Sequence, residues 1–261
     1  PSAAVPVDVG GPVEAVVAAS VYCALLQSGD VRCWGNQERG ELGLGHLDRI
    51  GDNEAPASPP AVDFGGVAVQ LTMGSRHACV LRDDGEVVCW GWGQHGETGY
   101  GTGEDVGDDE LPIDAGVVDV DATLGVLDIA AGGTRTCARL EGGLLKCWGD
   151  GEYLGYGDGL DIGDDELPAN VGDLGLGEFV EEVAVGGQHT CVRVTGGDVR
   201  CWGRNYHGQL GTGAAGDVLH ASAAAVVPLP APAVDVHAVG NTSCAILDTG
   251  ELYCWGQDRG L

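Results

Sequence analysis

The chain has 261 residues, of which 44% are hydrophobic and 5% aromatic, a composition typical of a globular protein. Its formal net charge is −28 at pH 7, and such a surface repels phosphate backbones and anionic lipids, so neither nucleic acid nor an acidic membrane is an expected partner. No run of eighteen apolar residues occurs, so direct insertion into a membrane is not expected either.

In chain order, the first predicted element is a strand in the apolar segment 4–9. Short apolar or β-branched runs bounded by glycine and proline follow at regular intervals and predict further strands. These runs cover residues 67–71, 126–131, 180–185 and 234–239. No window has a sustained period of 3.6 residues, so we expect little helix.

Each run leads into a phrase of the form Cys-x9-Cys-Trp-Gly, which occurs five times and uses all ten cysteines. The first cysteine recurs every 53 to 58 residues, for example 58 from Cys79 to Cys137 and 53 from Cys191 to Cys244. A fixed period of this length is the signature of a repeat architecture. The cysteine pairs are Cys23 and Cys33, Cys79 and Cys89, Cys137 and Cys147, Cys191 and Cys201, and Cys244 and Cys254.

The spacing within each phrase predicts a hairpin closed by a disulfide. The sixth residue after the first cysteine is glycine in every copy, which indicates a three-residue loop that ends in a left-handed glycine. The two cysteines then lie opposite each other on neighbouring strands, close enough to bridge. Zinc is the alternative, but zinc sites favour cysteines two to four residues apart. Five disulfides indicate an oxidising location: extracellular, periplasmic or at the cell surface.

The tryptophan of each phrase points to the opposite face of the strand from the cysteine before it, because side chains alternate along a strand. We therefore expect it to pack between repeats, and the alternative is an aromatic platform for a ligand.

The loops that link the repeats carry the densest polar residues. Segment 104–112 reappears as 160–168, with a partial copy at 48–56. Clustered carboxylates could supply the six to eight oxygens that Ca²⁺ takes, although the spacing does not match an EF-hand. The alternative is a turn with a solvated acidic face, or aspartates that cap backbone amides. The candidate metal ligands are Asp105, Asp108, Asp109, Glu110, Asp161, Asp164, Asp165 and Glu166. No other cofactor is expected.

Segment 202–213 reads Trp-Gly-Arg-Asn-Tyr-His-Gly-Gln-Leu-Gly-Thr-Gly, and residues 186–191 read Gly-Gly-Gln-His-Thr-Cys. This pattern resembles the repeats of the regulator of chromosome condensation (RCC1) family, in a disulfide-stapled variant of the secreted bacterial type. The resemblance is strongest in the fourth repeat and weaker elsewhere. It implies a β-propeller, commonly of seven blades, that binds proteins.

The expected fold is an all-β propeller of RCC1-like repeats, with one hairpin disulfide per blade and a single domain over residues 1–261. We expect five blades, and the alternatives are part of a seven-bladed ring or of a longer repeat array. Residues 1–11 are expected to close the ring by completing the last blade, which removes exposed sheet edges. The repeats are expected at residues 12–56, 66–112, 125–168, 180–228 and 234–261.

A rigid scaffold with long acidic loops predicts a non-enzymatic protein, secreted or at the cell surface, that binds a protein partner through those loops. The first alternative is a structural subunit of an extracellular assembly, formed by self-association and dependent on calcium. A hydrolase or carbohydrate-active enzyme comes last, because no catalytic pair stands out among forty acidic residues.

Overall fold

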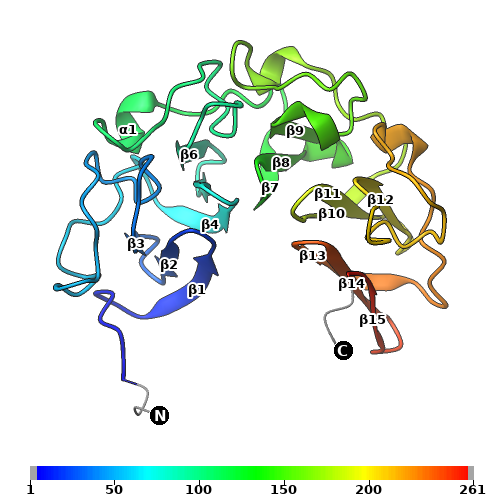
Figure 1. The fold of residues 1–261 in the computed structure, drawn as a ribbon, viewed down its shortest axis with the longest axis horizontal. Helices are drawn as coiled ribbons and strands as arrows, with labels where there is room; N and C mark the ends of the chain where they lie inside the picture. Colours follow the sequence, from blue (N-terminus) through cyan, green and yellow to red (C-terminus); the bar gives the residue numbers. More distant parts are fainter. Residues whose placement is uncertain (1–4, 258–261) are drawn as a thin grey trace.

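Within residues 5–257, which the computed structural model describes, fifteen β-strands form five sheets of three antiparallel strands along an open arc (Figure 1). The strands on the concave side are β1 (Val13–Ala18), β4 (Ala68–Met73), β7 (Val126–Gly132), β10 (Val180–Val185) and β13 (Ala233–Val239). The middle strands are β2 (Tyr22–Leu26), β5 (His77–Arg82), β8 (Arg135–Leu140), β11 (His189–Val194) and β14 (Thr242–Leu247). The outer strands are β3 (Val31–Trp34), β6 (Val87–Gly91), β9 (Leu145–Gly149), β12 (Val199–Gly203) and β15 (Leu252–Gly256).

The predicted disulfide hairpins are confirmed in all five sheets. In each one the two cysteines are register partners between the middle and outer strands, with Cα atoms 4.0 or 4.1 Å apart. The loop glycine has a positive φ in every hairpin, from 73° at Gly143 to 87° at Gly85. Because a residue with a Cβ rarely adopts this conformation, the glycine fixes the turn that brings the sulfurs together.

Neighbouring sheets pack face to face and also bond through their concave-side strands. The Gln70 side chain on β4 donates to the backbone oxygen of Ile129 on β7 at 2.9 Å and accepts from its N–H at 2.9 Å. Thr72 accepts from the N–H of Ala131 at 2.8 Å. Buried side chains from adjacent sheets form shared hydrophobic clusters, so the core lies between the sheets.

The N-terminal segment does not close the last blade as expected, and residues 1–4 of it lie outside the described residues. Val9 is buried against Ala24 and Leu26 of the first sheet, and the backbone oxygen of Asp8 accepts from the N–H of Ala57 at 3.1 Å. Segment 5–11 therefore covers apolar surface of the sheet it precedes, and the first and last sheets stay apart at the opening of the arc (Figure 1). Residues 5–9 of the predicted strand 4–9 do not form a strand, and the first strand of the described residues is β1.

Helices are short, as the sequence predicts: α1 (Pro112–Ala115) and the 3₁₀ turns η1 (Glu141–Gly143), η2 (Gly151–Tyr153), η3 (Pro168–Asn170) and η4 (Ala221–Ala223). Among the described residues no helix has the length and apolar character needed to cross a membrane.

Lys146, the only lysine of the chain, holds the connecting loops against the third sheet. Its Nζ donates to the backbone oxygens of Val120 at 3.1 Å and Pro168 at 3.2 Å, and lies 3.1 Å from a carboxylate oxygen of Asp121. The side chain is only 5% exposed. Hydrogen bonds from the Thr123 N–H and from Lys146 lower the pKa of Asp121 well below its usual range. Asp121 is therefore ionised, and its negative charge pairs with the positive charge of the buried lysine.

Candidate functional site

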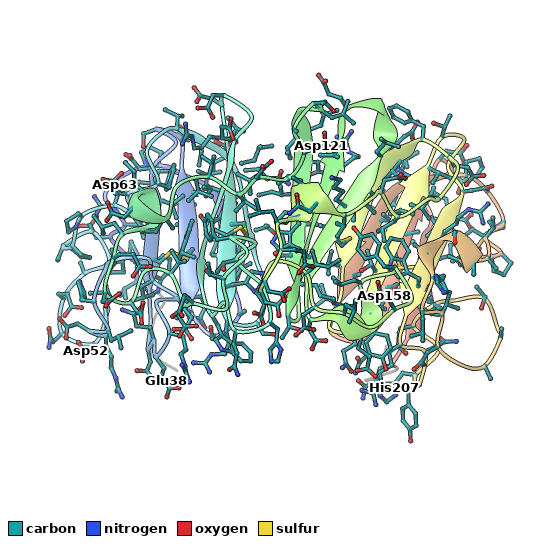
Figure 2. The ribbon with its side chains drawn as sticks, turned by 90° about the horizontal axis from the view of Figure 1, so that it is seen from above. Glu38, Asp52, Asp63, Asp121, Asp158 and His207 are labelled. Atoms are coloured by element: carbon teal, nitrogen blue, oxygen red, sulfur yellow. A yellow bond between two sulfur atoms is a disulfide. The ribbon has the colours of Figure 1, made fainter. Side chains whose placement is uncertain are left out.

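The molecule has two loop-bearing faces, which Figure 2 shows as opposite edges of the sheets. Asp63 and Asp121 lie on one face, and Glu38, Asp52, Asp158 and His207 lie on the other. The second face carries the glycine-rich turns that follow the outer strands, and we call it the turn face. Its turns span residues 35–43, 91–99, 149–155 and 203–211.

In four of the five sheets, the tryptophan of the repeated phrase fixes the sheet to the turn of the sheet before it. The Trp148 indole donates to the backbone oxygen of Glu97 at 3.1 Å, and its ring packs on Gly99. A Cβ added at Gly99 would lie 2.8 Å from the indole nitrogen, so no other residue fits there without a shift. The equivalent bonds run from Trp90 to Glu41, from Trp202 to Leu154 and from Trp255 to Gln209, at 2.9 to 3.1 Å. The predicted packing between repeats is confirmed for these four tryptophans, and Trp34 of the first sheet is the exception.

Two of the eight candidate metal ligands contact side chains of the preceding repeat. Asp105 accepts from the N–H of Gly93 at 3.1 Å and from the Arg39 guanidinium at 3.2 Å. Asp161 accepts from the N–H of Gly151 at 2.8 Å and lies 2.9 Å from the His95 ring.

The same arrangement recurs at Asp217, which accepts from the N–H of Asn205 at 2.8 Å and from the Tyr153 hydroxyl at 3.2 Å. Each of these aspartates caps the turn of its own repeat and bonds the turn of the repeat before it. The hydrogen bond with Asp161 raises the pKa of His95. The alternative that aspartates cap backbone amides thus describes Asp105 and Asp161.

The other six candidates form two clusters, Asp108–Glu110 and Asp164–Glu166, each with ligand atoms within 4.8 Å of one another. Burial, followed by a hydrogen bond with Asp165, raises the pKa of Glu166 to about 7. The residue arrangement is compatible with a divalent cation, which prefers grouped carboxylate oxygens.

The glycine at the centre of each acidic loop, Gly107 or Gly163, recurs because its backbone contacts the preceding repeat. The backbone oxygen of Gly163 accepts from the N–H of Gly101 at 2.9 Å, and that of Gly107 accepts from Gly45 at 3.1 Å. A Cβ at Gly163 would lie 2.5 Å from the Gly96 oxygen. Backbone-to-backbone packing between repeats therefore requires this glycine, whether or not the neighbouring carboxylates bind an ion.

The turn face also carries two pairs of an arginine and an aromatic ring that sequence reasoning missed. The guanidinium of Arg76 lies 5.8 Å from the centre of the Trp92 ring, and that of Arg204 lies 5.9 Å from the Tyr206 ring. Tyr206 is 78% exposed. Arginine, tryptophan and tyrosine are the residue types enriched at the energetic centres of protein interfaces. Trp92 is the one tryptophan outside the repeated phrase, and that was the available signal.

Between the sheets, two histidines serve as packing residues. The Nε2 of His77 lies 2.8 Å from the Thr136 hydroxyl, and that of His189 lies 2.7 Å from the Ser243 hydroxyl. Burial lowers the pKa of both imidazoles to about 4, so both are neutral at pH 7.

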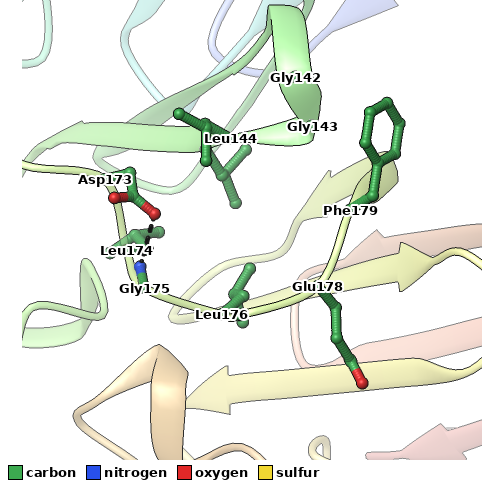
Figure 3. A pocket seen from close by; sticks show the side chains of 11 residues that line it. Gly142, Gly143, Leu144, Asp173, Leu174, Gly175, Leu176, Glu178 and Phe179 are labelled. Carbon is green, nitrogen blue, oxygen red and sulfur yellow. Dashed lines mark hydrogen bonds between the residues drawn. The ribbon is translucent and has the colours of Figure 1, made fainter.

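A hollow of about 370 Å³ lies on the opposite, hairpin-bearing face (Figure 3). Its wall is formed largely by glycines and leucines of the segments 142–145 and 173–179. The carboxylate of Asp173 accepts from the N–H of Gly175 at 2.9 Å and is thereby engaged in holding the loop. The only charged side chains in its lining are Asp173 and Glu178, and Glu178 is paired with Arg200, so the hollow offers no specific chemistry.

A sequence model described as the regulator of chromosome condensation (RCC1) repeat matches residues 68–97, 126–153, 180–209 and 233–259. The chain is 29% identical over 243 residues to the human E3 ubiquitin-protein ligase HERC2, with 91% of this chain and 5% of that protein aligned. It is 27% identical over 243 residues to the ultraviolet-B receptor UVR8 of Arabidopsis thaliana, with 90% of this chain and 50% of the receptor aligned.

Solved structures give the same result for the fold. Human WBSCR16 has a TM-score of 0.71 at 25% identity, and the match covers 91% of this chain and 59% of that one. Yeast RCC1 (Prp20), solved with Kap60, has a TM-score of 0.68 at 22% identity, and the match covers 95% of this chain and 56% of that one. The chain thus spans little more than half of these structures. Together with the five stapled sheets, these matches show that the chain carries RCC1 repeats and is an RCC1-like β-propeller.

Proposed function

We propose that this chain is a scaffold that binds a protein partner through its turn face, outside the reducing cytosol. The observation that carries the proposal is the exposed pair of Arg204 and Tyr206, with Arg76 and Trp92 on the same face. The turn that carries Arg204 and Tyr206 is capped by Asp217 and Gln209, so its backbone loses little conformational entropy on binding. Five disulfides favour an extracellular, periplasmic or cell-surface location.

The relatives support a binding role. Yeast RCC1 has been solved bound to Kap60, and the binding of Prp20p to Gsp1p and histones is described for Saccharomyces cerevisiae. None of these partners is proposed for this chain. Its net charge of −28 favours a partner with a basic surface. The acidic loops at Asp52 and Asp158 lie on the turn face as well (Figure 2).

The test is capture of partners from the native source on immobilised protein. We expect Tyr206→Ala to reduce the captured partner at least tenfold, because exposed aromatic anchors dominate interface energetics. Phe179→Ala is the matched control, since Phe179 is an exposed aromatic residue (47%) beside the hollow on the opposite face. Equal losses in the two variants would contradict the proposal.

The second candidate function is a calcium-dependent subunit of an extracellular assembly, which the two acidic clusters favour. Calcium is expected to produce larger particles in analytical ultracentrifugation, and a chelator is expected to disperse them. The double variant Asp164→Asn and Asp165→Asn should lose this response, whereas Asp83→Asn on a hairpin loop should keep it. A monomer at every calcium concentration would reject this function. No observation among the described residues favours the hydrolase alternative.

A further inference from the structure

One side-chain position recurs at three junctions between neighbouring sheets: Glu41, Glu97 and Gln209, each seven residues after the tryptophan of its turn. In all three, one side-chain oxygen caps the turn. Glu41 accepts from the N–H of Arg39 at 2.7 Å, Glu97 from that of His95 at 2.9 Å, and Gln209 from that of His207 at 2.8 Å. The second polar atom of each side chain remains for a partner from the next repeat.

At the first junction an arginine of the next repeat supplies that partner. The Nε of Arg76 donates to Oε1 of Glu41 at 2.9 Å, and its guanidinium also reaches Glu38 at 3.2 Å. The Glu41 side chain is only 3% exposed, so the guanidinium neutralises a buried carboxylate. Arg76 itself is 32% exposed and enters the junction from the turn face, beside Trp92.

At the second junction the carboxylate is present and the arginine is missing. Thr134 occupies the sequence position of Arg76, three residues before the first cysteine, and its hydroxyl bonds Asp150 at 3.4 Å. Glu97 is 0% exposed, and its Oε1 has no hydrogen-bond partner, nor has the buried hydroxyl of the adjacent Thr98. An unpaired buried carboxylate costs several kcal/mol. Asp150, which replaces Trp92 in the third repeat, adds a second acidic group at this junction.

The junction between the fourth and fifth sheets provides an internal control. It also lacks an arginine, since Asn241 stands at that position, and there the side chain is the neutral Gln209, whose Nε2, like Oε1 of Glu97, has no hydrogen-bond partner. An amide therefore caps the turn as well as a carboxylate does. The two junctions differ in what the second atom can bind: Oε1 of Glu97 can accept hydrogen bonds from a guanidinium group, whereas the Nε2 of Gln209 can only donate.

We propose that the junction between Glu97 and Thr134 receives a guanidinium group supplied from outside the chain, by an arginine side chain of the protein partner. The group would take the place that Arg76 fills at the first junction, between Glu97 and Asp150. This inference rests on the proposed function and specifies the group that is recognised: the partner presents an arginine side chain to the turn face, between the second and third sheets.

The test uses the full chain and N-acetyl-arginine methylamide, with the neutral citrulline analogue as its isostere. The Trp148 indole N–H is the reporter, because it bonds the backbone oxygen of Glu97 at 3.1 Å. We expect the arginine probe to shift this NMR signal saturably, with a dissociation constant on the order of 1 mM for one charged group. The citrulline analogue should leave the signal unchanged. Glu97→Gln should weaken arginine binding at least tenfold, and the variant should stay folded because a glutamine, Gln209, caps the equivalent turn in the fourth repeat.

Two further variants make the test independent of any single substitution. Thr134→Arg should place a guanidinium group of the chain itself in the junction. It should therefore raise the unfolding temperature and abolish the arginine-induced shift of the Trp148 signal. The gain in unfolding temperature should disappear when Thr134→Arg is combined with Glu97→Gln. Arg76→Thr should open the first junction, so that the Trp90 indole, silent in the wild type, also responds to arginine.

Equal responses to arginine and citrulline, binding unaffected by Glu97→Gln, or a Trp148 shift produced by calcium and not by arginine would overturn the proposal. Full retention of a captured partner by Glu97→Gln would also overturn it, while loss of that partner in Tyr206→Ala would leave the proposed function in place. Failure to capture any partner would instead count against the proposed function, because probe binding does not require a partner.

Discussion

The internal sheets and the first sheet use the same sequence phrase with different structural results. Trp148 is fully buried and bonds the turn of the preceding sheet. Trp34 is half-buried and stacks on Tyr22, with ring centres 5.8 Å apart, while Tyr22 is itself 52% exposed. Within the described residues no sheet precedes the first, so its tryptophan has no turn to enter. The stabilising role of the phrase therefore depends on the neighbouring repeat.

The largest expected effect tests this difference directly. Trp148→Ala should lower the free energy of unfolding by about 3–5 kcal/mol, because it opens a cavity between two sheets and removes the indole hydrogen bond to the Glu97 backbone oxygen. Trp34→Ala should cost about 1–2 kcal/mol, since less apolar surface is lost. Urea unfolding curves provide the comparison, and equal losses would show that the junctions do not carry the stability.

Removal of single disulfides is the next test. All five close loops of the same sequence separation, 10 residues, so loop entropy predicts a similar loss of about 2–3 kcal/mol for each. We expect the pair Cys137→Ala and Cys147→Ala to match the pair Cys23→Ala and Cys33→Ala within about 1 kcal/mol. A much larger loss in the third sheet would mean that packing around the sulfurs, rather than chain entropy, decides the effect.

Acid should weaken the internal junctions selectively. The pKa values of His77 and His189, lowered by burial to about 4, lie below the value of about 6.5 expected in the unfolded chain. Their contribution is therefore present above pH 6.5 and is lost as the pH falls toward 4. At pH 5 each histidine should cost about 2 kcal/mol. The first sheet has Val21 at this position, which does not titrate.

The measurement is the unfolding free energy at pH 7 and pH 5, in the wild type and in His77→Gln with His189→Gln. The double variant should lose most of the dependence on pH. An unchanged dependence would place the acid sensitivity in other groups.

The smallest expected effect concerns the pair of His95 and Asp161. The pKa of His95 is raised by its hydrogen bond with Asp161, so the pair stabilises the protein below about pH 6.5 and this contribution is lost as the pH rises through the folded-state pKa. The His95 side chain is 40% exposed, so solvent screening limits the effect to a few tenths of a kcal/mol. A titration of His95 by NMR in wild type and Asp161→Asn checks the direction: the pKa should fall in the variant.

The hairpins, their disulfides and the tryptophan packing could be predicted because they depend on spacings of at most eleven residues within one repeat. The contacts of Asp105 and Asp161 could not, because they join turns about 66 residues apart through the rotation from one sheet to the next. The same limit applies to Glu41 and Arg76. The prediction that the N-terminal residues 1–11 complete the last blade is wrong for segment 5–11. Val9 packs on the first sheet, which is the nearest one in the chain, and not on the last.

The position of Lys146 makes the chain unusually resistant to amine-reactive reagents. The single ε-amino group is 5% exposed and bound by backbone oxygens and Asp121, so acylating reagents should modify Lys146 only slowly while the protein is folded. Peptide mapping would quantify the modified lysine. The rate of acylation at Lys146 then reports how often the third sheet releases its connecting loops, and the protein carries its own single-site probe of that opening.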